Sequence, residues 1–284
     1  FINLFYRKFQ CKKSEYDGRI IVDFLQIGVL ALNKPMIQME GIVKQFGSIT
    51  ALDNMKFHAY GGEITAIVGD NGSGKSTLIQ LLTGCLKPDQ GVIQIKDRVF
   101  HSLTVKEAMN QGITAVYQNL ALDNCKDCAG NLFLGRELLR FGIFLDYGAM
   151  YRETEKLLGQ LHIHIPDIRQ PVEKMSGGQR QAVAIARAVY QNGDIMIFDE
   201  PTSAMGMKET ERIMNLFRAL KEQGKTIILI SHNLFQVFDI SDRICVIKNG
   251  RQIDSFLTRD SSPEQLYQTI IEKEDQTDGE KMDE

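Results

Sequence analysis

The stretch Gly69–Thr77, which reads GDNGSGKST, decides the fold of this chain. It fits the pattern GxxxxGK[ST] and lies in the setting that the pattern needs, after a predicted strand and before a predicted helix. The strand is the apolar run ITAIV at Ile64–Val68, and the helical pattern STLIQLLTG begins at Ser76. Glycines let the backbone approach an anion, successive N–H groups form a cradle, and the helix N-terminus adds positive charge. The stretch therefore predicts a phosphate-binding loop, called here the phosphate loop.

The side chains of the phosphate loop have separate predicted tasks. Lys75 can reach the outer phosphates of a nucleotide, and the Ser76 hydroxyl can bind Mg²⁺. The residues expected to contact the nucleotide are Gly69, Asn71, Gly72, Gly74, Lys75, Ser76 and Thr77.

Two acids at the end of another apolar run fit the same chemistry. In Ile195–Glu200, four apolar residues precede Asp199 and Glu200. A Mg²⁺ held by Ser76 needs a carboxylate near it, and Asp199 at the carboxyl end of a strand is placed for that. We expect Glu200, next to it, to polarise the water that attacks the phosphate.

A further segment, Ser176–Gln179 (SGGQ), comes just before the helical pattern QAVAIARAV and is called here the serine-glycine loop. Its serine hydroxyl, its glycine N–H groups and the positive end of the helix make a second anion-binding helix start. The same residues would also serve as an ordinary helix N-cap. Both interpretations stay open, and the conjunction of the two loops carries the functional argument.

Strands and helices alternate along the rest of the chain. Strands are expected at Ile37–Phe46, Lys56–Tyr60, Ile64–Val68, Gly112–Gln118, Asp194–Asp199, Thr226–Ser231 and Arg243–Lys248, and Gly91–Phe100 is expected to be an edge strand or a hairpin. Helices are expected at Gln179–Gln191 and Lys208–Gln223, and Leu120–Lys174 is expected to be mostly helical. The alternation predicts an α/β fold with a mainly parallel sheet, and the first strands suggest an added antiparallel layer.

Composition narrows the class of protein. The chain has 284 residues and a net charge of -3, which excludes a strongly basic nucleic-acid binder and a disordered acidic protein. It has no apolar run long enough to predict a membrane span. Its five scattered cysteines fit a reducing compartment. The CxxC spacing of Cys125 and Cys128 is interpreted as incidental, and His162 and His164 are expected at surface or strand-like positions.

The two ends differ from the middle of the chain. Residues 1–35 hold the basic-aromatic stretch FYRKFQCKK and a short apolar run. We expect this extension to lie outside the fold and to come from an upstream start or an added sequence, with a membrane-surface anchor as the alternative. The folded domain is predicted at 36–272, and residues 273–284 are predicted to form a solvated acidic tail.

The motifs occur in the order and spacing of ABC-type ATP-binding subunits. They are Gly69–Thr77, Gln118, Ser176–Gln179, Ile195–Glu200 and Ser231-His232. The chain resembles that family from about Met36 to Phe256. The resemblance implies a P-loop NTPase core, an antiparallel β layer on its N-terminal side and an inserted helical subdomain at about 119–180. It also implies a head-to-tail dimer, in which each ATP lies between one subunit's phosphate loop and the partner's serine-glycine loop.

The resemblance also assigns roles by position. Glu200 would be the catalytic base, His232 would hold the γ-phosphate, and Gln118 would contact the Mg²⁺ and the attacking water. Mg²⁺ would be bound by Ser76, Gln118 and Asp199. Phe46 would stack on adenine, although an aromatic residue in a strand is more often part of the core. The contacts to ATP across the dimer would come from Ser176, Gly177, Gly178 and Gln179.

One segment departs from the usual family pattern. Ser203–Glu209 reads SAMGMKE, and Gly206 stands where most members have an aspartate that communicates across the dimer. This puts the usual coupling between the two sites in doubt. The segment resembles the version found in single-domain ATP subunits of bacterial simple-sugar importers of the ribose, fructose and xylose types. Val116–Leu122 and Asn131–Glu137 resemble that group as well.

The resemblance therefore implies an ATPase that energises a simple-sugar importer at the cytoplasmic face of the membrane. The implied partners are a second ATPase subunit, identical or paired, multi-span permease subunits and, through them, a periplasmic or extracellular sugar-binding protein. No nucleic-acid partner is expected. The alternatives are a soluble ABC ATPase that acts on ribosomes or DNA, a transport ATPase for another substrate, and a regulatory ATP-binding module with little turnover.

Overall fold

The computed structural model describes residues 34–268, and every structural statement below concerns that part of the chain. By its contacts the chain divides into two units, Phe1–Lys34 and Pro35–Glu284. The second unit opens with strand β1, which begins at Pro35, next to the predicted start of the domain. The expectations for the N-terminal extension and the acidic tail fall outside the described residues, apart from the last two positions of the extension.

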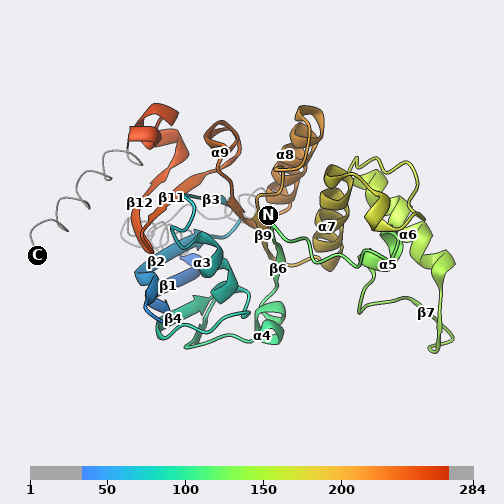
Figure 1. Ribbon diagram of the computed structural model, residues 1–284, viewed down its shortest axis with the longest axis horizontal. Coiled ribbons are helices and arrows are strands. Elements are labelled where there is room, and N and C mark those ends of the chain that lie inside the picture. The colour runs from blue at the N-terminus through green and yellow to red at the C-terminus, as the bar shows by residue number, and fades with distance from the viewer. Residues whose placement is uncertain (1–33, 269–284) are drawn as a thin grey trace, which may run out of the picture. The chain divides into compact units, whose positions relative to one another are not determined.

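A six-stranded sheet forms the centre of this unit, in the order β12-β11-β3-β10-β9-β6 (Figure 1). Its strands are β3 (Ile64–Val68), β6 (Ile113–Val116), β9 (Ile195–Asp199), β10 (Thr226–Ile230), β11 (Arg243–Lys248) and β12 (Arg251–Leu257). Neighbouring strands pair in parallel, except that β12 runs antiparallel to β11. Every residue of β3, β9 and β10 is buried, as expected for a parallel sheet covered on both faces. The predicted mainly parallel sheet is confirmed.

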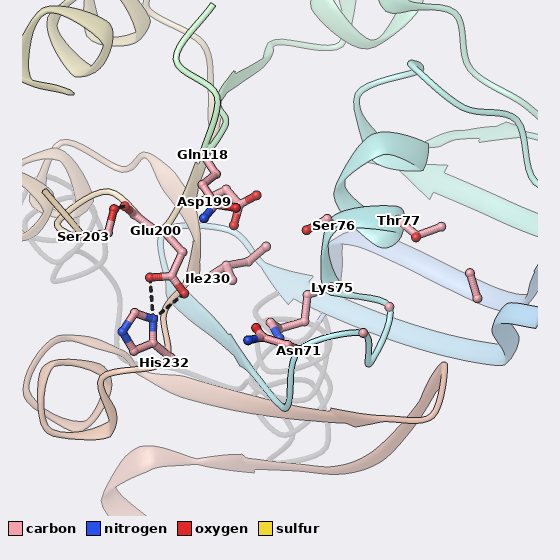
Figure 2. Close-up of a pocket in the computed structure, with 13 residues that line it drawn as sticks. Asn71, Lys75, Ser76, Thr77, Gln118, Asp199, Glu200, Ser203, Ile230 and His232 are labelled. Atoms are coloured by element: carbon pink, nitrogen blue, oxygen red, sulfur yellow. Dashed lines mark hydrogen bonds and ion pairs between the residues drawn. The ribbon is translucent and has the colours of Figure 1, made fainter. Parts of the chain in front are cut away.

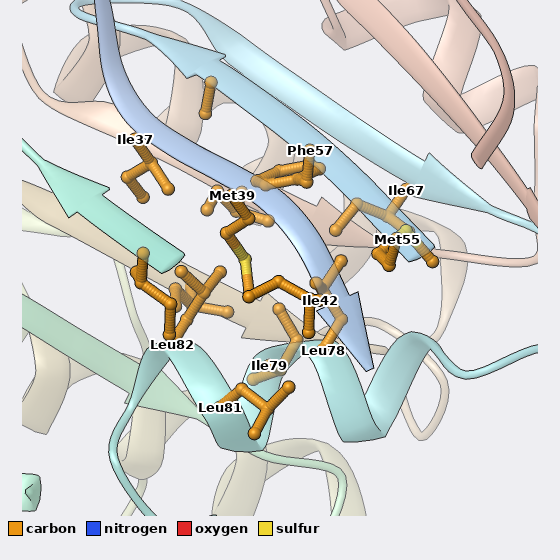
Figure 3. Packing of buried hydrophobic residues seen from close by; sticks show 14 of the residues in the cluster. Ile37, Met39, Ile42, Met55, Phe57, Ile67, Leu78, Ile79, Leu81 and Leu82 are labelled. Atoms are coloured by element: carbon orange, nitrogen blue, oxygen red, sulfur yellow. The ribbon is translucent and has the colours of Figure 1, made fainter. Parts of the chain in front are cut away.

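A second sheet, entirely antiparallel, covers one face of the first. Its order is β2 (Ile49–Tyr60), β1 (Pro35–Phe46), β4 (Gln90–Ile95) and β5 (Arg98–Phe100). Helix α3 (Lys75–Leu82) packs under it, and Figure 3 shows Met39 and Ile42 of β1 near Ile79 and Leu82 of the helix. The predicted antiparallel layer is confirmed, and of the two alternatives for Gly91–Phe100, an edge strand or a hairpin, the structure has the hairpin, formed by β4 and β5.

Two helices cover the opposite face of the central sheet, α7 (Gly177–Gln191) and α8 (Met207–Glu222). The alternation of side chains along β9 separates the two cores. Ile195 and Ile197 face the antiparallel layer, whereas Met196 and Phe198 face the helices. On the helical side, the rings of Phe198 and Phe217 stack with their centroids 4.4 Å apart.

The segment between β6 and α7 is less helical than predicted. It contains the short helix α5 (Cys128–Leu132), the longer α6 (Tyr147–Gln160) and a 3-10 turn at Val172–Lys174. Between α5 and α6 it forms a hairpin of β7 (Leu139–Arg140) and β8 (Phe144–Leu145). The turn residues Phe141 and Gly142 have φ of 55° and 74°, and positive φ is incompatible with a right-handed helix. The helical subdomain is present, but the expectation that Leu120–Lys174 is mostly helical is wrong.

The remaining helical elements are short and were not predicted. Helix α4 (Val105–Asn110) begins with a capping box between Thr104 and Glu107. Helix α9 (Leu234–Ile240) follows β10, and a 3-10 turn at Thr258–Asp260 follows β12. None of the helices within residues 34–268 is both long enough and apolar enough to cross a lipid bilayer.

The cysteines and histidines noted in the sequence take no part in a metal cluster within the described region. Cys125 is exposed and Cys128 is buried, and both are free thiols. Burial raises the pKa of Cys128 to about 12. His162 and His164 lie exposed in the turn that follows α6, so the surface interpretation holds and the strand-like one is wrong.

The stacked pair between β9 and α8 allows a stability prediction. Phe217 is 0% exposed, and its truncation in Phe217→Ala removes a ring from a closed core. We expect this change to lower the free energy of unfolding by about 3–5 kcal/mol, measured by urea denaturation. The control is Phe235→Ala in α9, because Phe235 is 82% exposed and should cost little. Equal losses in the two variants would contradict the packing described here.

Candidate functional site

The phosphate loop joins β3 to α3, and two of its glycines are required by the packing of the chain itself. Gly69 has φ of 149°, and a Cβ atom there would lie 2.0 Å from the carbonyl oxygen of Ile247. Gly74 has φ of 105°, and a Cβ atom there would lie 2.7 Å from the carbonyl oxygen of Ala51. Any larger residue at either position would force the loop away from β11 or β2. The loop is therefore held in shape by backbone-to-backbone contact.

Lys75 is the first residue of α3, and its side chain points back into the loop. Its Nζ donates hydrogen bonds to the carbonyl oxygens of Gly69 and Asp70, each at 2.7 Å. Burial lowers the pKa of Lys75, while the nearby carboxylates of Glu200, Asp70 and Asp199 act in the opposite direction. A cation surrounded in this way is well placed to meet the negative charge of a phosphate.

The predicted chemistry comes together in one pocket of about 350 Å³ (Figure 2). It is bounded by the phosphate loop, by Gln118 two residues after β6 and by the carboxyl ends of β9 and β10. The predicted site residues that line it are Asn71, Gly72, Gly74, Lys75, Ser76, Thr77, Gln118, Asp199, Glu200 and His232. Gly69 does not line the pocket, but its carbonyl oxygen accepts a hydrogen bond from Lys75, which does. Ala51, Ser203 and Ile230 line the pocket as well and were not predicted.

Asp199 ends strand β9 and is only 6% exposed. Burial raises its pKa, and the neighbouring Glu200 raises it further, while Lys75 and a hydrogen bond from the backbone of Gln118 lower it. In Figure 2 the Asp199 carboxylate and the Ser76 hydroxyl lie on facing sides of the pocket. A buried carboxylate that is costly to ionise suits a position that receives a cation.

Glu200 and His232 form a pair at the mouth of this pocket. Nδ1 of His232 lies 2.8 Å from Oε1 and 2.7 Å from Oε2 of Glu200. The histidine side chain is 76% exposed and the glutamate side chain 16% exposed. The histidine therefore approaches the carboxylate from the solvent side.

The backbone of Glu200 is in the left-handed region, with φ of 53°. A residue other than glycine in this region costs about 1–3 kcal/mol, so neighbouring groups have to hold it. Its N–H donates to the carbonyl oxygen of Ile230 at 3.0 Å, which ties it to β10. Its carbonyl oxygen accepts from Nε2 of Gln181 at 2.7 Å and from Oγ of Ser203 at 3.0 Å. Neither contact was predicted, although a glutamine at the start of the apolar run AVAIA was a signal for a buried polar contact.

The serine-glycine loop begins α7 and is an N-cap in the structure. Oγ of Ser176 accepts from the Gln179 N–H at 3.2 Å, and Oε1 of Gln179 accepts from the Ser176 N–H at 2.9 Å. The loop also lines a second pocket of about 400 Å³, with His162, His164, Glu209 and Arg212 among its other walls. Within residues 34–268 the two pockets have no lining residue in common, so the structure does not bring the two loops into one site.

Gln118 lines the first pocket, and the segment after it is attached to α7. Arg187 of α7 donates from Nη2 to the carbonyl oxygen of Leu120 at 2.8 Å and from Nη1 to that of Ala121 at 2.9 Å. Burial lowers the pKa of Arg187. This attachment links the position of Gln118 to the helix that the serine-glycine loop begins. The sequence analysis did not identify Arg187.

Phe46 stands apart from the other predicted residues. It ends β1, is 46% exposed and is not among the residues that line either loop's pocket. Nζ of Lys44 lies 5.5 Å from the centroid of its ring. An exposed ring is free to stack on a flat ligand, so its contact with adenine stays a prediction.

Comparison with known proteins gives the family. The family model described as ABC transporter matches residues 52–203, more than half of the chain. The chain belongs to the ABC transporter family. It is an ATPase of the ABC type, and the pocket at the phosphate loop is where the fold brings most of the residues predicted to bind ATP together.

Curated relatives and solved structures extend this finding. The fructose import ATP-binding protein FrcA of Rhizobium meliloti is 42% identical, over 78% of this chain and 87% of that protein. The xylose/arabinose import ATP-binding protein XylG of Sulfolobus acidocaldarius is 39% identical, over 83% of this chain and 93% of that protein. The ribose import ATP-binding protein RbsA of Caldanaerobacter subterraneus is 34% identical, and the match spans 48% of its length. A solved dimeric ATP-binding cassette with ADP and Pi has a TM-score of 0.71 at 27% identity and covers 79% of this chain and 99% of that chain.

The raised pKa of Asp199 allows a prediction about the ABC domain without its ligands. Because the folded pKa lies above the usual value of 3.8, the ionised carboxylate weakens the fold at neutral pH. We expect Asp199→Asn to raise Tm at pH 7, by about 2–4 °C for each kcal/mol gained in the free energy of unfolding. We expect the same change to abolish ATP hydrolysis. The gain should vanish as the pH falls below the usual aspartate range.

Thermal unfolding from pH 3 to pH 8, with steady-state ATPase assays at pH 7, checks this. The control is Asp260→Asn, because that carboxylate is 62% exposed and pairs with Arg259 at the surface. A lower Tm for Asp199→Asn at pH 7 would contradict the effect of burial.

Proposed function

We propose that this chain is the ATP-hydrolysing subunit of an ABC importer for a simple sugar. The observation that carries the catalytic part is the single pocket in which Lys75, Asp199 and Glu200 meet. The sugar part is supported by the relatives, which are named as fructose, xylose/arabinose and ribose import ATP-binding proteins. The chain would act at the cytoplasmic face of the membrane.

In this proposal the phosphate loop binds the phosphates of ATP and Glu200 acts as the base. The attacking water gives a proton to the Glu200 carboxylate, its oxygen bonds to the γ-phosphorus, and the bond to the bridging oxygen of ADP breaks. His232 contacts the same carboxylate and would orient it or hold the γ-phosphate. The strained backbone of Glu200 fixes the direction from which the base acts.

The oxygen donors of the pocket fit Mg²⁺. Ser76 offers a hydroxyl, Asp199 a buried carboxylate and Gln118 an amide, all lining the same pocket. Mg²⁺ is commonly bound by one or two carboxylates together with substrate phosphates and water, and this set has that composition. When bound, the ion would neutralise charge on the transferred phosphate.

The separation of the two pockets supports a dimer. An ATP bound at the phosphate loop of one chain would meet a serine-glycine loop only if a second subunit supplied it. We therefore propose a head-to-tail dimer, with an identical or a paired ATPase subunit. A solved relative is titled as a dimeric ATP-binding cassette with ADP and Pi. In such a dimer Ser176, Gly178 and Gln179 would contact the partner's ATP.

Transport itself would need other proteins. The proposed partners are permease subunits in the membrane and, through them, a sugar-binding protein outside the cytoplasm. Opening and closing of the ATPase dimer would then move the permease helices. Gly206, where many ABC members have an acid, leaves ATP binding unaffected in this scheme.

The first prediction of this proposal concerns Glu200. We expect Glu200→Gln to retain ATP binding and to lose steady-state hydrolysis by at least about 100-fold, because the base for the attacking water is gone. ATP should then hold the variant as a dimer, measured by size-exclusion chromatography. The control is Glu222→Gln at the exposed end of α8. Turnover near the wild-type rate in Glu200→Gln would contradict the role of Glu200 as base.

The second prediction concerns the substrate. Membrane vesicles containing this chain with its permease and binding protein should hydrolyse ATP faster when a simple sugar is present. Ribose, fructose, xylose, arabinose and galactose are the sugars to test, with an amino acid as the control. Stimulation by the amino acid and by none of the sugars would overturn the proposed substrate class and leave the ATPase assignment standing.

A further inference from the structure

Gln181 is a buried polar residue of α7 and lies two residues beyond the serine-glycine loop. It is 3% exposed, and both ends of its amide are used. Nε2 donates to the carbonyl oxygen of Glu200 at 2.7 Å, and Oε1 accepts from the Ala204 N–H at 3.3 Å. One side chain therefore spans the turn that begins at Glu200 and ends at Ala204.

That turn lies between β9 and α8, and it begins with a strained residue. Glu200 has its left-handed φ of 53°, and the Ser203 N–H and Oγ both bond to its carbonyl oxygen, at 3.3 and 3.0 Å. The Glu200 N–H holds the turn to Ile230 of β10 and the Thr202 hydroxyl holds it to Gln236 of α9, and the Gln181 amide adds the contact from α7. It therefore fixes the turn relative to α7, whereas the Ser203 bonds fix it only internally.

The glycines of the serine-glycine loop rest on the same turn. A Cβ atom at Gly177 would lie 3.2 Å from Cβ of Ala204, and one at Gly178 would lie 3.3 Å from the Ala204 carbonyl oxygen. The first turn of α7 and Ala204 are thus in close contact, and Gln181 adds hydrogen bonds one turn further along. The loop at the start of α7 and the backbone of Glu200 are joined as one packed unit.

We propose that Gln181 is a positioning residue that couples the two ATP sites of the dimer. This inference rests on the proposed function, in which Glu200 serves its own chain's site and the serine-glycine loop serves the partner's site. A displacement of the serine-glycine loop by the partner's ATP passes through Gln181 to Glu200. The same connection carries a displacement of Glu200 back to the loop. The coupling runs inside one chain and needs no acid at Gly206.

The first experiment separates positioning from folding. Gln181→Met keeps the length of the side chain and loses both hydrogen bonds, and Gln181→Glu keeps the acceptor for Ala204 but loses the donor to Glu200. We expect both variants to bind ATP within about twofold of wild type and to lose kcat by about tenfold or more, because the Glu200 carbonyl oxygen loses its hydrogen bond to α7 and the base is held less firmly. The control is Gln223→Met at the exposed end of α8.

Circular dichroism and Tm show whether the variants fold. If Gln181→Met does not fold, Gln181→Glu still tests the positioning role. A folded variant with wild-type kcat would overturn the positioning role. If Glu200→Gln is inactive in the same assay, wild-type kcat in a Gln181 variant would leave the proposed function intact. If the wild-type chain did not hydrolyse ATP, the proposed function itself would fail.

The second experiment tests coupling between the sites with two kinds of mixed dimer, purified through two different affinity tags. Each contains one Gln181→Met subunit, and Lys75→Ala disables the phosphate loop either in that subunit or in its partner. When the partner is disabled, the working site uses the altered subunit's Glu200. When the phosphate loop of the altered subunit is disabled, the working site uses the partner's Glu200 and the altered subunit's serine-glycine loop.

We expect both mixed dimers to hydrolyse ATP at least about fivefold more slowly than matched dimers with wild-type Gln181, because the connection acts in both directions. A loss confined to the dimer that uses the altered subunit's Glu200 would overturn the coupling.

Discussion

The parallel pairing of β3, β10 and β9 is the constraint on which the site depends. Ile230 pairs with Ile67 on one side and with Asp199 on the other, so the three strands end at one edge. The phosphate loop leaves β3 at this edge, the two acids end β9, and His232 follows β10. Residues far apart in the sequence therefore meet in one pocket. The apolar, fully buried strands fix the register, because a shift by one residue would exchange their two faces.

The residues with a local sequence signal were predictable. The phosphate loop, the acids after an apolar run and the N-cap serine each follow from the types of residue and their immediate neighbours. The contacts that hold Glu200 were not predictable in this way. Gln181 and Ser203 act through the backbone of a turn, and no spacing in the sequence indicates which carbonyl a buried amide will meet. Arg187 was missed for the same reason, because its partners are the carbonyl oxygens of Leu120 and Ala121.

The fold was predicted best where burial is complete. Strands β3 and β11 agree with their predicted ranges, because continuous apolar runs between turn signals leave few alternatives. The subdomain between β6 and α7 was predicted worst. Its hairpin depends on positive φ at Phe141 and Gly142, and the side chains of Phe141, Ile143 and Phe144 remain exposed. An apolar stretch that stays on the surface resembles a buried helix in the sequence, and only the tertiary structure distinguishes the two.

The separation of the phosphate loop and the serine-glycine loop has a kinetic consequence. If a complete ATP site needs two subunits, the number of active sites in dilute solution follows the number of dimers and not the number of chains. Hydrolysis per chain then rises with protein concentration until the dimer saturates, and the rate is second order in protein below that point. Tethering two copies to one membrane complex removes this dependence, because the effective concentration is set by the complex. Membrane attachment would in this way act as an activator of the ATPase.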